Sequence, residues 1–508
     1  MDAHTTHIVA RKNTSLSFTS NELMDHFPFA WLPMDPFTAM ALSGTLSPSF
    51  STTSTNDTMY NLNPALYASL VPPIRKPATP TTLEVGRQCK EEEDASIRLV
   101  HLLITCTSAI ETGDYSIAQG NLSEARKILG EIPTSTGIGR VGKHFIDALV
   151  QRLFPAYPHA APPSPSPSTS IDLHNNFYDA GPYLKFAYST ANQAILKAIK
   201  GYNHVHIIDF SLMQGLQWPA LMDVFSAREG GPPKLRITGI GPNPIGGRDE
   251  LHEVGIRLAK YAHSVGIDFT FQGVCVDQLD RLCDWMLLKP IKGEAVAINS
   301  ILQLHRLLVD PDANPVVPAP IDILLKLVIK INPMIFTVVE HEADHNRPPL
   351  LERFTNALFH YATMFDSLEA MHRCTSGRDI TDSLTEVYLR GEIFDIVCGE
   401  GSARTERHEL FGHWRERLTY AGLTQVWFDP DEVDTLKDQL IHVTSLSGSG
   451  FNILVCDGSL ALAWHNRPLY VATAWCVTGG NAASSMVGNI CKGTNDSRRK
   501  ENRNGPME

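Results

Sequence analysis

The stretch Val205-His206-Ile207-Ile208-Asp209 decides the fold of this chain. Together with Phe210 it is an almost uninterrupted apolar run, which is typical of a strand buried on both faces of a parallel sheet. Helical and strand-like patterns alternate after it, and this alternation predicts β-α-β units. The predicted helices are 217–228, 250–265 and 349–368, and the predicted strands are 235–240, 269–274, 295–301 and 334–340.

The C-terminal part of the chain is predicted to close the same sheet. Strands at 451–456 and 460–465 flank Asp457-Gly458, a dipeptide typical of a two-residue hairpin turn. We therefore expect an α/β fold with a mostly parallel, Rossmann-like sheet that ends in a methyltransferase-like antiparallel hairpin, an analogy that concerns the fold alone. The other predicted elements here are helices 408–423 and 433–446 and strands 425–428 and 469–476.

Helical periodicity dominates the chain before residue 200. Apolar residues recur at helical spacing in the segments 97–110, 117–129 and 145–153. The predicted globular domain, 95–478, thus divides into a mainly helical cap subdomain at 95–200 and an α/β core at 201–478. A Pro/Ser-rich insertion at 158–170 interrupts the cap, because its prolines exclude both helix and ladder.

Both ends of the chain are polar and lack periodicity. Within 38–58, eleven of the 21 positions are Ser or Thr, and prolines follow at 72–80. Such a composition buries too little apolar surface to offset the entropy of ordering the chain. Residues 1–94 and 479–508 are therefore predicted to be disordered.

Charge and cysteine content narrow the functional classes. A net charge of −12 argues against direct nucleic-acid binding, which needs a basic face. The nine cysteines include no Cys-x-x-Cys pair, so neither a zinc ribbon nor a disulfide framework is indicated. No apolar run reaches the ~20 residues that span a bilayer, and we expect no membrane association. Arg498-Arg499-Lys500 is a short basic cluster of the kind found in nuclear localisation signals and in solvated tails.

The turn after Asp209 is poorly suited to a cofactor. A nucleotide or S-adenosylmethionine site there needs a glycine-rich turn that lets the backbone approach the ligand. Residues 209–219, DFSLMQGLQWP, contain one glycine, and three bulky residues, Phe210, Leu212 and Met213, stand where small residues are needed. We expect no cofactor and no catalytic residue. Asp209 and Glu340, at strand ends, are expected to cap a helix or to pair with an arginine.

Two short motifs match patterns that serve other functions. His341-Glu342-Ala343-Asp344-His345 matches the zinc motif His-Glu-x-x-His, which requires a helix to place both imidazoles on one face. Because it follows a strand and precedes Pro348-Pro349, we expect a loop and no metal site. The segments LVHLL (99–103) and LHRLL (304–308) match the groove-binding pattern Leu-x-x-Leu-Leu, but core packing is the expected role of these leucines.

The order of several motifs resembles that of the plant GRAS family over residues 96–477. Val205-His206-Ile207-Ile208-Asp209 resembles the motif known by those five letters, and leucine-rich helices flank it. Two stretches, RITGIGP (236–242) and FTVVEHEADHN (336–346), are most similar to DELLA-type repressors of gibberellin signalling. Further matching positions are Pro333, Tyr361, Phe365, Asp366, Arg407, Glu409, Trp414, Gly422, Trp464, Ala474 and Trp475.

This resemblance implies a nuclear, non-enzymatic regulator of transcription with a role in gibberellin-related signalling and plant development. Its implied partners are DNA-binding transcription factors, zinc-finger proteins among them, and other GRAS proteins or a second copy of itself. The N-terminus departs from the DELLA pattern, because Asn21-Glu22-Leu23-Met24 and Tyr60-Asn61-Leu62-Asn63-Pro64 match the receptor-binding segments only faintly. Binding to the hormone receptor is therefore left open. The alternative hypothesis is an S-adenosylmethionine-dependent methyltransferase or a small-molecule-binding protein with the same fold.

Overall fold

The structure is a computed structural model that divides into two compact units. The first comprises Met1–Lys12 with Lys90–Glu508 and contains nearly all of the described residues, and the second is Asn13–Cys89. No helix in the described part of the chain is long and apolar enough to cross a membrane. The described residues are 5–10, 82–132, 136–155, 167–243, 249–276, 279, 282, 288–312, 318–374, 384–429, 433–438 and 450–480.

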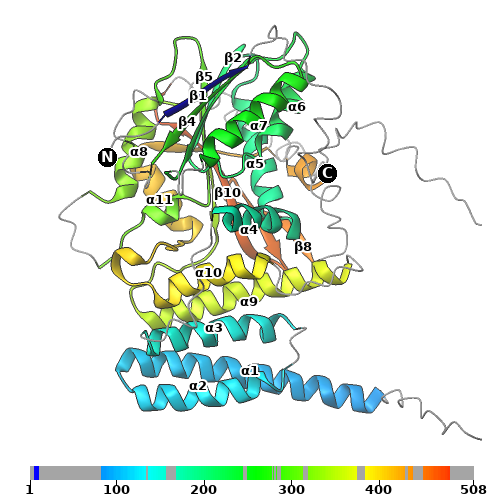
Figure 1. Ribbon diagram of the computed structural model, residues 1–508, viewed down its shortest axis with the longest axis vertical. Helices are drawn as coiled ribbons and strands as arrows, with labels where there is room; N and C mark the ends of the chain where they lie inside the picture. Colours follow the sequence, from blue (N-terminus) through cyan, green and yellow to red (C-terminus); the bar gives the residue numbers. More distant parts are fainter. Residues whose placement is uncertain are drawn as a thin grey trace, which may run out of the picture. The chain divides into compact units, whose positions relative to one another are not determined.

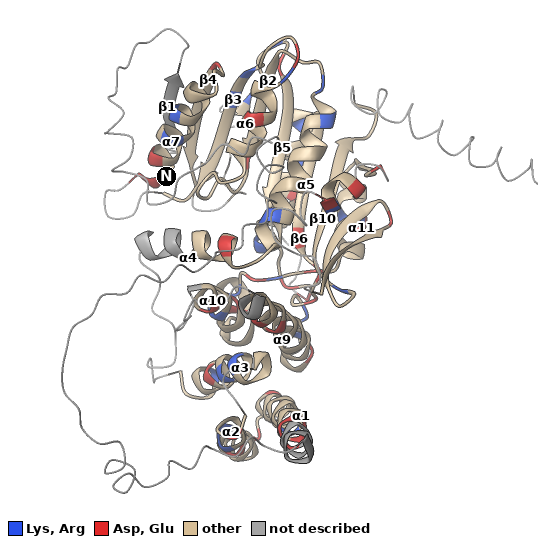
Figure 2. Cartoon of the chain, turned by 90° about the vertical axis from the view of Figure 1, so that its right-hand side faces the viewer, with Lys and Arg blue, Asp and Glu red and all other residues tan. Residues whose placement is uncertain are grey.

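The described strands form one mixed sheet of ten strands (Figure 1). Its middle strands are parallel to one another. From β2, the strands β3 and β4 follow on one side and β5 and β6 on the other, and this switch in strand order confirms the predicted Rossmann-like fold. Figure 2 shows β1, β4, β3, β2, β5, β6 and β10 in succession. The parallel strands, in sheet order, are β4 (Phe269–Cys275), β3 (Lys234–Gly241), β2 (His204–Asp209), β5 (Ala295–Ile301) and β6 (Ile335–His341). The antiparallel strands are β1 (Thr5–Ala10) beside β4, and β10 (Arg467–Val477), β9 (Ser459–Trp464), β8 (Phe451–Cys456) and β7 (Leu423–Val426) beyond β6.

Strand β2 supplies side chains to two apolar cores, one on each face of the sheet. Val205 and Ile207 belong to one core, whereas Ile208 and Phe210 belong to the other. Because side chains alternate along a strand, a continuous apolar run is buried on both faces. Helices α5 (Tyr183–Ala198), α6 (Trp218–Ser226) and α7 (Glu250–Ser264) contribute to the first core, and α8 (Pro320–Ile331) and α11 (Phe411–Tyr420) contribute to the second.

The helices that pack around α3 form a helical layer and come from more of the chain than the cap predicted at 95–200. Helix α3 packs against α2 and also against α9 and α10, which follow β6 in sequence. Phe145 of α3 meets Phe354 of α9 edge-on, with ring centroids 5.2 Å apart. Thr136 caps α3, because its hydroxyl accepts the Gly139 N–H. These helices are α2 (Tyr115–Leu129), α3 (Gly137–Leu153), α9 (Leu350–Cys374) and α10 (Leu384–Cys398).

Two predicted boundaries were wrong. The region 1–94, predicted to be disordered, contains β1 and the start of helix α1 (Thr82–Thr112). Its remainder, like the tail beyond residue 480, lies outside the described residues. Strand β1 pairs antiparallel with β4, so a distant partner positions a segment whose own composition indicates no strand. Helix α4 (Pro167–Ala180) begins inside the predicted insertion 158–170, since proline is tolerated at the first helical position.

The predicted C-terminal hairpin is confirmed. Strands β8 and β9 pair from Phe451 opposite Trp464 to Cys456 opposite Ser459. The two turn residues, Asp457 and Gly458, have φ angles of 47° and 75°. Two consecutive left-handed residues are the geometry of the turn that matches strand twist, which explains why Asp-Gly occurs there.

Candidate functional site

The turn after β2 is filled by its own side chains. Phe210 and Leu212 are 2% exposed, whereas Met213 is 43% exposed. Phe210 packs edge-on against Phe336 of β6, and Leu212 covers Gly239 of β3 so closely that a Cβ there would lie 2.4 Å from Leu212 Cδ2. Two of the three bulky residues therefore occupy the carboxyl edge of the sheet, where Rossmann-like folds bind cofactors.

Asp209 holds this turn closed. Its carboxyl group accepts hydrogen bonds from the Ser211 N–H (3.1 Å), Trp218 Nε1 (2.9 Å) and Asn299 Nδ2 (3.3 Å). Burial raises the pKa of Asp209 to about 6, although these hydrogen bonds oppose the rise. Contrary to the prediction, Asp209 neither caps a helix nor pairs with an arginine of the described chain; its carboxyl group instead joins the turn to Trp218 of α6 and Asn299 of β5.

The histidine of the same motif is neutral. Arg236 Nη2 lies 2.9 Å from His206 Nδ1, and His206 Nε2 lies 2.8 Å from Thr238 Oγ1. Because a guanidinium only donates, Nδ1 accepts and the proton is on Nε2. Burial and the charge of Arg236 lower the pKa of His206 well below its ordinary value. Val205, His206, Ile207, Ile208 and Asp209 are thus all buried in the sheet.

The His-Glu-x-x-His match lies in a loop, as predicted. His341 ends β6, and His345 lies in the segment before α9. Both imidazoles nevertheless enter one buried cluster of five histidines. His341 Nδ1 is 3.2 Å from His360 Nε2, and His345 Nδ1 is 2.9 Å from His408 Nδ1. His305 completes the cluster, with its ring centroid 4.3 Å from that of His408.

Two glutamates flank His305, which lies on the short helix η5 (Leu304–Leu307). His305 Nδ1 is 2.6 Å from Glu340 Oε2, and Nε2 is 2.8 Å from Glu406 Oε2. Burial disfavours a charge on His305, but the two carboxylates outweigh it and raise the pKa of His305 to about 9. Glu340 Oε1 also accepts the Leu304 N–H at 2.8 Å. Glu340 therefore caps a helix as predicted, with a histidine in place of the expected arginine.

Burial and neighbouring charges shift the pKa values of Glu406 and of the other four histidines in this cluster. Burial opposes ionisation of Glu406, yet Arg306 and His305 hold the pKa of Glu406 well below its usual range. Arg306 Nη2 lies 2.8 Å from Glu406 Oε1. Burial lowers the pKa of each other histidine: to about 3 for His360, to about 4 for His408, and well below the ordinary value for His341 and His345.

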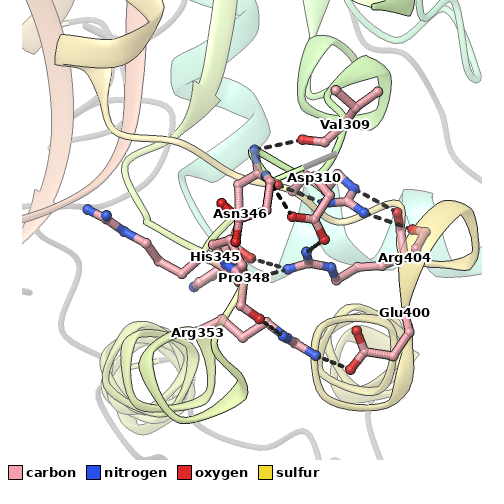
Figure 3. A network of polar contacts seen from close by, with 12 residues as sticks. Val309, Asp310, His345, Asn346, Pro348, Arg353, Glu400 and Arg404 are labelled. Atoms are coloured by element: carbon pink, nitrogen blue, oxygen red, sulfur yellow. Dashed lines mark hydrogen bonds and ion pairs between the residues drawn. The ribbon is translucent and has the colours of Figure 1, made fainter. Parts of the chain in front are cut away.

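Buried arginines fasten the segment 404–409 to the loop after β6 (Figure 3). Arg404 Nη1 donates to the His345 carbonyl at 3.0 Å. Asn346 accepts from Arg407 Nη1 at 2.8 Å and donates to Glu409 Oε1 at 2.8 Å. These bonds hold 404–409 outside any helix or strand, so the helix predicted at 408–423 begins only at Phe411.

A further arginine extends this network to the helical layer. Arg353 of α9 is 1% exposed and donates to the Pro348 carbonyl at 2.6 Å and to Glu400 (Figure 3). Glu400 also accepts from Arg152 of α3. The carbonyls and carboxylates therefore satisfy charges that would be costly to bury alone. The network connects the sheet to helices α3 and α9.

The family-motif positions on α9 contact α10 and β9. Tyr361 donates to Glu392 Oε2 at 2.8 Å, and burial raises the pKa of Glu392 to about 8. Asp366 Oδ2 accepts from Trp464 Nε1 at 2.7 Å, and the neighbouring Phe365 is fully buried. These residues join the helical layer to the sheet.

The other family-motif positions lie elsewhere in the packing. Trp414 of α11 and Trp475 of β10 share the second core, and Ala474 lies opposite Thr337 of β6. Gly422, with a φ of 101°, makes the turn between α11 and β7. Pro333 is buried just before β6, and Arg407 and Glu409 meet at Asn346. The predicted positions do not converge on one pocket, and their functional roles stay predictions.

The leucine motifs lie in the core, and a cavity beside β6 is small. Leu99 and Leu103 are fully buried, as are Leu304 and Leu307 to within a few per cent, which confirms the predicted core role. A cavity bounded by Glu340 and other residues of β6 and α11 has a volume of about 10 Å³. Such a volume holds about one water molecule.

The histidine–glutamate cluster was missed at the level of sequence. His305 lies 35 positions from Glu340 and 101 from Glu406, so no local spacing connects them. The one local signal is the short spacing of Glu406 and His408 in Glu406-Arg407-His408. Glu406 and His408 face the cluster, while Arg407 faces Asn346.

Comparisons with known proteins agree with the motif order. The sequence profile of the GRAS domain family matches residues 99–476. The chain is 51% identical over 440 residues to Protein SLENDER RICE1-LIKE 2 of Oryza sativa subsp. japonica, covering 84% of this chain and 87% of that protein. It is 39% identical over 388 residues to DELLA protein GAI of Arabidopsis thaliana, covering 76% and 69%.

A solved structure agrees as well. The crystal structure of SCL7 in Oryza sativa superposes with a TM-score of 0.62 at 29% identity, covering 74% of this chain and 99% of that chain. The profile match and the identities to relatives each span most of the chain. The chain belongs to the GRAS domain family.

Proposed function

We propose that this chain regulates transcription in gibberellin-related signalling by binding DNA-binding transcription factors, and that it catalyses no reaction. The observation that carries the proposal is the family match over residues 99–476, together with the DELLA relatives. The filled turn after β2 supports the non-enzymatic part, because Leu212 covers Gly239 where a cofactor would approach. Zinc-finger factors, other GRAS proteins and a second copy of this chain are the proposed partners, and the nucleus is the proposed compartment.

Purification of the tagged full-length chain from plant nuclei tests the partner class. Transcription factors should be recovered, and a reporter driven by a recovered factor should change its output when the chain is co-expressed. Recovery of no such factor in repeated purifications would contradict the proposal. A fluorescent fusion located outside nuclei would contradict the proposed compartment.

The methyltransferase alternative has its own test. Calorimetric titration of the full-length chain with S-adenosylmethionine should give neither binding heat nor a shift of the melting temperature. Saturable heat with about one site per chain would establish the alternative instead.

A further inference from the structure

The nitrogen atoms of His345 and His408 cannot all be satisfied by protein groups in the described structure. The two rings meet through their Nδ1 atoms at 2.9 Å, so one of these atoms donates and the other accepts. The Nε2 atoms of both residues are buried, and neither has a hydrogen-bond partner among the described residues. Buried polar atoms of this kind are rare and require an explanation.

The orientation at His408 indicates what is missing. Its Nε2 lies 3.4 Å from Glu406 Oε2, a contact longer than an ordinary hydrogen bond. Two tautomers fit this pair: when His345 donates, the His408 Nε2–H points to Glu406 Oε2. When His408 donates from Nδ1, its Nε2 lone pair faces that oxygen, and two acceptors confront each other. A cation between them converts this conflict into two bonds.

A third donor completes the set. His305 Nε2 lies 2.8 Å from the same Glu406 oxygen, and one ligand atom from each of His305, Glu406 and His408 lies within 4.8 Å of the others. Tetrahedral zinc, with bonds of roughly 2.0–2.2 Å, separates its ligand atoms by about 3.3 Å. Small movements of the three side chains therefore suffice to bind the ion.

The surroundings also match those of metal sites in proteins. Ligand histidines usually place their other ring nitrogen against a carboxylate or another fixed partner. Here Glu340 Oε2 lies 2.6 Å from His305 Nδ1, and His345 fixes the Nδ1 of His408. Arg306 holds the second oxygen of Glu406 at 2.8 Å. Each of the three candidate ligands is thus oriented by a neighbour.

We propose that His305, Glu406 and His408 bind one zinc ion, which ties η5 to the segment 404–409. On binding, the zinc displaces the proton between His305 Nε2 and Glu406, and that proton leaves to solvent. All three ligands are buried, so the ion has a structural role and no substrate reaches it. The zinc fastens the loop that carries Arg404, Arg407 and Glu409 to the end of the sheet.

Metal analysis of the full-length chain tests this site. Chain dialysed against buffer with micromolar Zn²⁺ should retain about one zinc per molecule, and its melting temperature should rise with zinc concentration. His408→Gln should lose both the zinc and the thermal shift. His360→Gln, a buried histidine of the same cluster outside the ligand set, should keep both. Glu340→Gln should weaken zinc binding about 10–100-fold.

Cobalt substitution keeps the test independent of whether the variants fold. Co²⁺ added to the wild-type chain should give visible bands of nitrogen and oxygen coordination, with no thiolate charge-transfer band in the near ultraviolet. Three results would overturn the proposal: no zinc retained by the wild-type chain, unchanged zinc in folded His408→Gln, or a thiolate signature that places the ion on cysteine.

Discussion

The contact between Leu212 and Gly239 can be tested by a double-mutant cycle. A Cβ on Gly239 would lie 2.4 Å from Leu212 Cδ2, 3.1 Å from Cγ and 3.2 Å from Cβ. Because the clash reaches the base of the leucine side chain, rotation of its tip cannot relieve it. Gly239→Ala should therefore destabilise the chain by about 1–3 kcal/mol, as overpacking of a core does.

The second arm of the cycle removes the leucine. Leu212 is 2% exposed, so Leu212→Ala should cost about 2–5 kcal/mol through lost burial and the cavity left behind. In the double variant, the alanine methyl at position 239 enters the space that the leucine vacates. The combined cost should be smaller than the sum of the two single costs by about 1–3 kcal/mol.

Equilibrium urea unfolding, followed by tryptophan fluorescence and by circular dichroism, measures all four proteins. Gly120→Ala is the matched control, since Gly120 is an exposed residue of α2 with nothing within 4 Å of an added Cβ. That control should be stabilised by about 0.5–1 kcal/mol, because alanine is the better helix former. Additivity within about 0.5 kcal/mol, or a Gly239→Ala variant as stable as wild type, would refute the proposed filling of the turn.

Three further outcomes follow from single contacts. Burial raises the pKa of Asp209 to about 6 from 3.8, so between pH 4 and 6 the folded chain holds a proton that the unfolded chain has lost. The stability of wild type relative to Asp209→Asn should therefore fall with rising pH across that window, by up to about 3 kcal/mol, and a pH-independent difference in urea unfolding would contradict this. Tyr361→Phe removes one hydrogen-bond donor from buried Glu392 and should cost about 1–3 kcal/mol in thermal unfolding; an unchanged melting temperature would show that the bond contributes nothing. Gly458→Ala should cost more than Gly113→Ala by the same assay, because both have positive φ but only at Gly458 would the new Cβ strike a side chain, that of Trp427, at 2.5 Å; equal costs would mean that the indole moves aside freely.

The parallel sheet could be predicted from sequence because its signals are local. The apolar run ending at Asp209 is a strand buried on both faces, and the Asp457-Gly458 turn specifies its hairpin by itself. Strand β1 could not be predicted, since its register depends on β4, far away in the chain. The helical layer was only partly foreseen, because helices α9 and α10 contact α3 across a long stretch of sequence.

The candidate site, like the fold, could be predicted from sequence only where its residues are close together in the chain. The filled turn after β2 was predictable, since bulky residues stand where glycines are needed. The histidine cluster was not, because His305, His360 and His408 come from three separate segments that only the fold brings together. The His-Glu-x-x-His match was correctly placed in a loop, but its two histidines share the cluster with residues that no motif contains.

Strand β10 has a consequence for synthesis on the ribosome. It pairs with β6 on one side and β9 on the other, and Thr473 bonds to the Val338 carbonyl across 135 positions. Until those last residues emerge, the nascent chain exposes the hydrogen-bonding edge of β6. Such an edge is a template for pairing with another chain. Products truncated by a premature stop before Arg467 should therefore aggregate or require chaperones, even though they carry every strand of the parallel centre.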